Sequence, residues 1–415
     1  MKLVELSKKE FDSFAQSLEI TTFQQSSCWA KFKEGEKWHA YYIALKDKNT
    51  ILAGTLLLAK EKKPLKLRFF YAPRGFLIDY KNEELLNSFT KEIISFIKKK
   101  KGVLLKIDPY VLKCERDKNG EIVEGGKQND FIVENLENVG FIKLNEKDKL
   151  FIQPKWLYQI SYIGKTFEQV MAEMEKKTRQ IIRKNEKRGF TIRELAIDEY
   201  NLFDELMNIQ NEKYNVLDCT LLFYQDLLEA FGKEHMKIMG IFFDLKEEYK
   251  KIEDQLANLD IEKEQKIYSY HHTKMKESTF IDKQLKYENE KKRLEERYKE
   301  MKALEEKEKT DYIFLGAYLY LLYNDEIICL QGAIKDEYKK YRASYTLHYR
   351  MMKKAYDEGY KIYNFYEILG VKNEEGPQYG SYEFKRNFGG QVVELIGEFD
   401  LPILKDKYNL IKNSF

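Results

Sequence analysis

A strongly charged segment, residues 245–309, interrupts the chain between two apolar stretches and restricts how the whole sequence can fold. It is rich in Lys, Glu and Gln, and its apolar residues recur at three- and four-residue steps, as in helices that pack on one another. One face carries Leu245, Tyr249, Ile252, Leu256 and Leu259, and another carries Ile281, Leu285, Leu294, Tyr298, Met301 and Leu304. We therefore expect an inserted arm, an antiparallel coiled coil whose turn covers residues 269–278.

Such an arm would project far from the body of the protein. At 1.5 Å per residue each helix would extend roughly 35 Å. This length suits contact with a large partner, and a spacer or a contact between two copies of the chain fits the same residues. His271 and His272, near the predicted turn, are interpreted as solvated side chains.

The rest of the chain alternates helical and strand patterns twice. The first pass predicts helices over 8–17 and 83–100, and strands over 38–45, 51–59 and 102–108. The second predicts helices over 167–187, 200–214 and 221–231, and strands over 191–194, 236–243, 312–323 and 327–334. We expect an α/β fold with a first domain over 1–158, a second over 159–244 and 310–415, and the arm, 245–309, inserted in the second.

Composition excludes several classes of protein. The 72 basic and 69 acidic residues nearly cancel, so an anionic partner must meet a local basic patch. The longest apolar run, residues 312–323, is shorter than the roughly 20 residues that cross a bilayer, and the N-terminus lacks a signal-peptide pattern. The four cysteines show no CxxC spacing, and no HExxH, Walker loop or Ser/His/Asp order is present. These features predict a cytoplasmic protein without a metal site.

A basic stretch, KKTRQIIRKNEKRGFTIR over residues 176–193, holds eight basic residues and one acidic residue. Its apolar positions fall on one face of a helix, so the basic side chains face solvent or an anion. Arg and Lys both suit phosphate, and a solvated helix face explains the same pattern equally well.

Two further segments contain candidate catalytic groups. In FKRNFGG, Lys385 lies among aromatic residues, where its ammonium could stabilise an oxyanion or simply pack along the rings. In KIDPY, Asp108 follows an apolar strand, a position where α/β proteins often place ligand-facing groups, and it could equally cap the strand end.

Taken in order, several segments resemble the FemXAB family of peptidoglycan peptidyltransferases over nearly the whole chain. They are FQQSSCWAKFK from Phe23, APRGFLIDY from Ala72, KIDPY from Lys106, TRQIIRKNEKRGFTIRE from Thr178, the arm, and the closing run YKIYNFYEILG, YEFKRNFGG and GEFDLP. The resemblance implies two domains folded like GNAT acetyltransferases. It also implies transfer of an amino acid from aminoacyl-tRNA to the stem or bridge peptide of lipid II or UDP-MurNAc-pentapeptide, without metal or acetyl-CoA.

The resemblance also implies roles for individual residues. Lys385 would stabilise negative charge on the carbonyl oxygen or the tRNA ribose, and Asp108 would help the acceptor amine to lose its proton. Lys33 matches a lysine that contacts the precursor's diphosphate. The other residues implied to bind substrate are Trp29, Tyr110 and Phe384. Those implied to contact tRNA are Arg179, Arg183, Lys184, Lys187 and Arg188.

This chain departs from the family pattern in two places. Cys219 stands where relatives usually carry an arginine for the diphosphate, and residues 367–369 interrupt a stretch that is often glycine-rich. The first departure bears on how the precursor binds, and the second on which amino acid is transferred.

Two other functions remain open at this point. One is an acyl-CoA-dependent N-acetyltransferase, although the usual Q/R-x-x-G-x-G/A loop is not evident. The other is a non-catalytic RNA-binding or scaffold protein that uses the basic helix and the arm. Any contact with a membrane would be peripheral.

Overall fold

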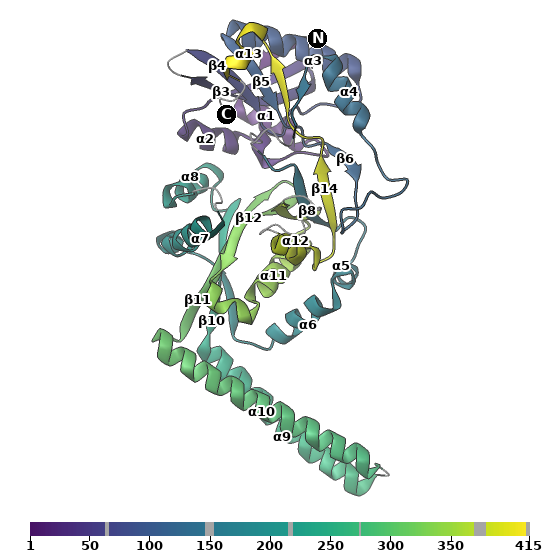
Figure 1. Cartoon of the computed structure of the whole chain (residues 1–415), viewed down its shortest axis with the longest axis vertical. Coiled ribbons are helices and arrows are strands. Elements are labelled where there is room, and N and C mark those ends of the chain that lie inside the picture. Colours follow the sequence, from purple (N-terminus) through teal and green to yellow (C-terminus); the bar gives the residue numbers. More distant parts are fainter. Residues whose placement is uncertain (63–65, 146–152, 215–218, 274, 369–378, 412–415) are drawn as a thin grey trace.

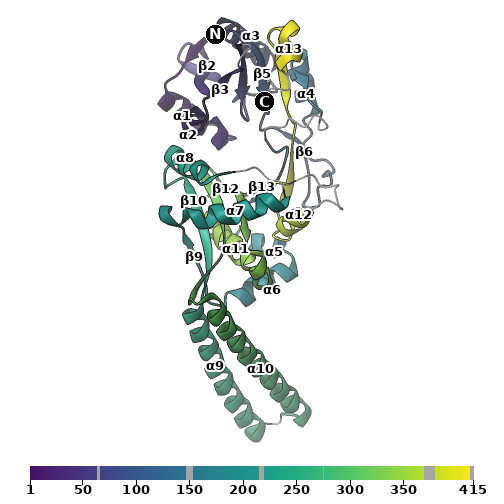
Figure 2. The same cartoon turned by 60° about the vertical axis from the view of Figure 1, so that its left-hand side comes forward.

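The computed structural model describes residues 1–62, 66–145, 153–214, 219–273, 275–368 and 379–411. Two β-sheets follow one another along the long axis of the molecule, helices flank both, and two long helices extend from the end of the second sheet (Figures 1 and 2). The predicted α/β class is confirmed.

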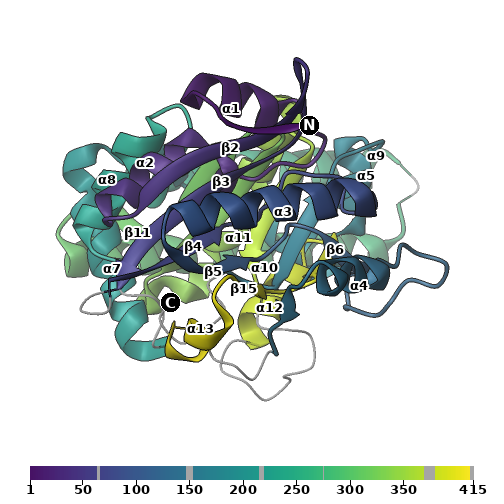
Figure 3. The same cartoon turned by 90° about the horizontal axis from the view of Figure 1, so that it is seen from above.

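The first sheet has seven strands in the described part of the chain, and only β4 and β5 pair in parallel there. Its order is β1 (Lys2–Glu5), β2 (His39–Asp47), β3 (Thr50–Lys62), β4 (Leu67–Ala72), β5 (Gly102–Ile107), β15 (Phe399–Pro402) and β7 (Ile142–Lys143). The parallel pair is connected by α3 (Glu83–Lys99), which lies across the sheet (Figure 3). Asn82 caps this helix, and its buried face includes Phe89 and Ile93.

The second sheet repeats this arrangement with eight strands among the described residues. Its order is β6 (Leu112–Glu115), β14 (Gln391–Leu395), β8 (Trp156–Ser161), β13 (Ile362–Glu367), β12 (Glu326–Ile334), β11 (Tyr312–Tyr323), β10 (Met236–Asp244) and β9 (Phe190–Glu194). Here β12 and β13 are parallel, connected by α11 (Ala343–Asp357). Both sheets therefore place a helix between two parallel strands.

The two sheets exchange strands. β6 comes from the first part of the chain and pairs with β14 in the second sheet, whereas the C-terminal β15 pairs with β5 in the first. The division predicted at residue 158 and the assignment of 310–415 to the second domain thus do not follow sheet membership. Sequence periodicity reports what a strand buries, not which strand it pairs with.

A shared apolar core joins the two halves. Helices α1 (Lys8–Gln16) and α2 (Ser27–Gly35) belong to the first half, while α7 (Tyr200–Tyr214) and α8 (Leu221–Phe231) belong to the second. One continuous cluster includes buried residues from all four helices and both sheets, and α2 packs against α8 (Figure 3). The aromatic contacts between the halves include Phe32 with Phe223, whose ring centroids are 5.2 Å apart.

Residues of the predicted arm form α9 (Leu245–His272) and α10 (Glu277–Glu308), which run side by side away from both sheets (Figure 2). The expected turn over 269–278 is too long, because α9 continues to His272. The expected contact face is also wrong near the tip, where Ile281 is 57% exposed and Leu285 is 61% exposed. Nearer the sheets the expected face is correct, because Leu294 and Met301 are fully buried. Towards the tip, Phe280 and Tyr287 of α10 lie together with Leu259 of α9.

The helix predicted over 167–187 is broken. It forms α5 (Phe167–Glu173) and α6 (Lys176–Asn185), with extended backbone at Met174. The Arg179 guanidinium donates to the carbonyl oxygens of Ala172 and Met174 at 2.9 and 2.5 Å. These hydrogen bonds pair carbonyl oxygens that the C-terminal end of α5 would otherwise leave without a donor. The remaining helices are α4 (Asp130–Asn138), α12 (Tyr379–Arg386) and α13 (Lys405–Ile411).

Candidate active site

A cavity of about 490 Å³ opens on the second sheet. Its walls come from α7, β11, β12, α11, β13 and α12, so segments distant in sequence converge on it. Aromatic and apolar residues line it together with several polar and charged ones, a combination that small-molecule sites use to bind and orient a ligand. The lining includes Met207, Tyr318, Gln331, Phe365, Ser381 and Phe384.

Lys385 lies on the wall of this cavity, as part of α12. Its Nζ donates to the backbone oxygen of Glu367 at 2.5 Å. Burial lowers the pKa of Lys385 to about 8, and the nearby groups of Cys329 and Glu367 oppose that shift. A cation that is only partly hydrated can stabilise a negative charge more strongly than one in open water.

Aromatic packing fixes the orientation of α12. The Phe384 ring makes an edge-to-face contact with Tyr345 at 4.9 Å, and Phe388, just after the helix, is fully buried. Phe384 itself lines the cavity, so it is placed beside Lys385 as the sequence predicted for a substrate contact. Its binding role stays a prediction.

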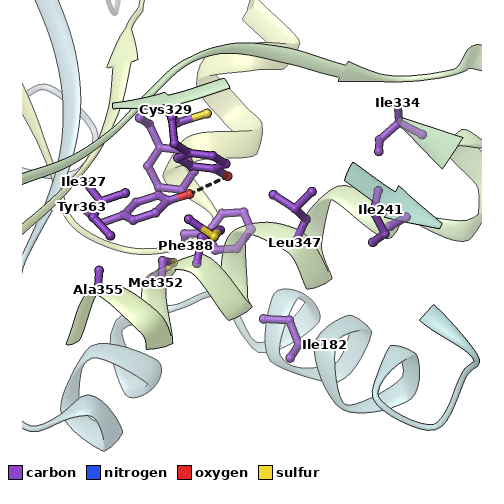
Figure 4. Packing of buried hydrophobic residues seen from close by; sticks show 14 of the residues in the cluster. Ile182, Ile241, Ile327, Cys329, Ile334, Leu347, Met352, Ala355, Tyr363 and Phe388 are labelled. Carbon is purple, nitrogen blue, oxygen red and sulfur yellow. Dashed lines mark hydrogen bonds between the residues drawn. The ribbon is translucent and has the colours of Figure 1, made fainter. Parts of the chain in front are cut away.

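His348 is a cavity residue that sequence reasoning missed, because no spacing motif marks it. It is buried, and its Nδ1 lies 2.7 Å from the hydroxyl of Tyr363. Burial lowers the pKa of His348 to about 3, with Lys385 acting in the same direction, so the imidazole is neutral at physiological pH. Cys329, Tyr363 and Phe388 belong to one cluster of buried residues (Figure 4).

Asp108 lies at the junction of the two sheets, directly after β5. Its Oδ1 accepts from the backbone N of Arg74 at 2.8 Å, and its Oδ2 lies 3.6 Å from the Arg74 guanidinium. Burial raises the pKa of Asp108 to about 6, against the opposing effect of Arg74. Asp108 is not among the described residues that line the cavity. Its predicted role in proton removal stays a prediction.

Arg74 connects Asp108 to the rest of the junction, and sequence reasoning did not single it out. Its guanidinium donates to the oxygen of Pro154 at 2.8 Å and lies 5.8 Å from the centre of the Tyr110 ring. Tyr110 in turn accepts from Gln159 at 2.6 Å. Desolvation raises the pKa of the Glu367 carboxyl, and both Arg74 at the junction and Lys385 on the cavity wall oppose that shift.

Lys33 lies on α2, where the two halves meet. Its Nζ is 2.8 Å from Glu36 and 4.9 Å from the centre of the Trp29 ring. Trp29 is buried in the shared core, and Cys219 is buried in the same core. A buried thiol at position 219 carries no positive charge for a diphosphate.

The five residues predicted to contact tRNA form two groups in the structure, those with partners inside the protein and those with exposed side chains. Arg179 caps α5, and Arg188 pairs with the buried carboxylate of Glu248 at 3.1 Å, so both have internal partners. The other three, Arg183, Lys184 and Lys187, have exposed side chains.

Neither a metal site nor a membrane span is found in the described ranges. No group of three or more His, Cys, Asp or Glu side chains there could hold a metal ion. No helix in the same ranges is long and apolar enough to cross a membrane.

A two-sheet α/β protein with a partly desolvated ammonium on a cavity wall has the parts of an enzyme that stabilises a developing negative charge. The chain belongs to the FemAB family, whose model matches residues 6–413.

Individual relatives match over almost their whole length. The chain is 25% identical to aminoacyltransferase FemA of Staphylococcus aureus (strain MRSA252) over 415 residues, covering 98% of this chain and 97% of FemA. It is 26% identical to aminoacyltransferase FemA of Staphylococcus epidermidis over 429 residues, covering 99% and 98%. The crystal structure of FemX superposes with a TM-score of 0.83 at 24% identity, covering 99% of this chain and all of FemX. The fold is therefore that of FemX.

Proposed function

We propose that this protein is an aminoacyltransferase that moves an amino acid from aminoacyl-tRNA to the peptide of a peptidoglycan precursor, lipid II or UDP-MurNAc-pentapeptide, in the cytoplasm. Membership of the FemAB family supports the class of reaction. The observation that carries the proposal is the position of Lys385, on the wall of a cavity large enough for an aminoacyl group. Each half would fold like a GNAT acetyltransferase, and α9 with α10 would form a coiled coil.

The chemistry requires little beyond positioning. The acceptor amine attacks the carbonyl carbon of the ester, and the carbonyl oxygen becomes negatively charged. The bond to the ribose oxygen then breaks, so the amine loses one proton and the ribose oxygen gains one. Lys385, as an ammonium, would stabilise the charged oxygen during this step.

The acceptor, the peptidoglycan precursor, would bind at the junction of the two halves. Tyr110, Arg74 and the Asp108 carboxylate lie there, and Lys33 with Trp29 lies on α2, which faces the second half. In this proposal Lys33 contacts the diphosphate of the precursor. A lipid-linked precursor would bring the protein to the membrane surface only peripherally.

A transfer assay tests the function. Purified protein is incubated with a mixture of charged tRNAs and with lipid II or the nucleotide precursor, and the products are analysed by mass spectrometry. We expect the mass of one or more amino acid residues to be added to the stem peptide, and to be absent when the tRNA is uncharged. No addition with lipid II, the nucleotide precursor or a partly built bridge would contradict the proposal.

For the basic helix, we expect replacement of Arg183 and Lys184 by alanine to weaken tRNA binding about tenfold. Both side chains are exposed, and each lost phosphate contact should lower the slope of log affinity against log salt by about one. Fluorescence anisotropy with labelled tRNA over a range of salt concentrations measures both quantities. The control is Lys91→Ala, an exposed lysine of α3 on the first half. Equal affinity of the double variant and wild type would exclude this surface.

A further inference from the structure

Glu367 ends β13 and lines the cavity that holds Lys385. Of the cavity-lining residues that the structure describes, Glu367 is the one with an acidic side chain, and Lys339 and Lys385 are the two with ammonium groups. Lys339 pairs with Asp336 at 2.6 Å. No Lys, Arg or His side chain in the described ranges forms an ion pair with the Glu367 carboxylate, and the Glu367 side chain is exposed.

The backbone before Glu367 is held in an unusual conformation. Tyr366 has a positive φ of 61°, and its backbone N donates to the Asn364 side chain at 2.8 Å. The Lys385 ammonium donates to the backbone oxygen of Glu367 and not to its carboxylate. Partial desolvation beside the cavity wall raises the pKa of the Glu367 carboxyl, and Lys385 and Arg74 act in the opposite direction.

An aminoacyl ester brings a positive charge of its own into such a cavity. An α-amino group has a pKa of about 8, so it is largely an ammonium at neutral pH. Beside the Lys385 ammonium this group would be repelled unless a nearby carboxylate offsets the charge. Simple acyl esters carry no such charge and gain nothing from a carboxylate.

We propose that the Glu367 carboxylate binds the α-ammonium of the aminoacyl donor and thereby selects an aminoacyl ester over an acyl ester that lacks the amine. This inference rests on the proposed function and adds a residue that recognises the donor. In this arrangement Lys385 stabilises the carbonyl oxygen of the donor, and Glu367 binds the α-ammonium next to that carbonyl.

The test compares two donors that differ in one group. One is a mixture of charged tRNAs, and the other is the same tRNA after nitrous acid has converted the α-amine to a hydroxyl. We expect wild type to prefer the aminoacyl donor about 10- to 100-fold in kcat/KM, the range of a charge-assisted hydrogen bond. Glu367→Gln should lose most of this preference, mainly by slower use of the aminoacyl donor.

Two control variants separate donor recognition from folding. Glu383→Gln makes the same change at an exposed position of α12 and should keep the full preference. Glu367→Asp keeps the charge and should retain a preference at a lower rate. A role in folding alone would lower the use of both donors equally in Glu367→Gln.

Two other sets of results would contradict either the role of Glu367 or the proposed function itself. Equal use of both donors by wild type, or an unchanged preference in Glu367→Gln, overturns the role of Glu367 and leaves the proposed function standing. No transfer by wild type from any charged tRNA overturns the proposed function, and this inference with it.

Discussion

Replacing Lys385 with alanine is expected to lower kcat/KM for amino acid transfer about 100- to 1000-fold, the loss typical of removing one group that stabilises an oxyanion. The ammonium lies on the wall of the cavity, partly desolvated, with its position set by the carbonyl oxygen of Glu367. The fold should survive, because no buried carboxylate depends on this lysine for an ion pair in the described ranges. Single-turnover rates and thermal melting of wild type and variant measure the two effects.

Lys339→Ala is the matched control, since it removes the other lysine of the same cavity. That lysine is exposed and paired with Asp336, so a change of less than about threefold is expected. The pH profile adds a second readout. Because the Lys385 pKa is about 8, its charged form is lost as the pH rises through 8, and transfer should decline above that pH. Unchanged turnover in Lys385→Ala would remove this residue from the mechanism.

Replacing Glu248 with alanine is expected to lower the free energy of unfolding by about 3–5 kcal/mol, as when one partner of a buried ion pair is removed. This carboxylate is fully buried where the arm begins. It accepts from Arg188 at 3.1 Å, from Arg297 at 2.5 Å and from the backbone N of Gly189 at 2.6 Å. Its removal takes one carboxylate acceptor from two arginines and from one backbone amide. Chemical denaturation followed by circular dichroism measures the change.

Glu253→Ala serves as the control because Glu253 is exposed on the same helix, α9, and a change within about 0.5 kcal/mol is expected. Hydrogen exchange at residues 187–190 locates the effect, which should be faster exchange in Glu248→Ala alone. A Glu248 variant as stable as wild type would show that the arm is not anchored by this carboxylate.

Part of the site could be predicted from the sequence. Lys385 stands among aromatic residues in FKRNFGG, and the structure places it on a cavity wall beside Phe384. Asp108 lies at the end of a buried strand as expected, but its carboxylate faces Arg74 and not the cavity. The basic stretch marked a charged helix correctly. It did not distinguish Arg179 and Arg188, which have internal partners, from the exposed Arg183.

The sequence by itself determined the α/β class, the approximate positions of most helices and strands, and the likeness to FemXAB enzymes. Each of these depends on periodicity or on short motifs, which lie within one segment of chain. Only the tertiary structure decided that β6 and β15 change sheets, and that His348 and Glu367 join Lys385 around one cavity. Strand partners and charge neutralisation depend on groups that meet within about 4 Å across the fold, and spacing along the chain does not encode those meetings.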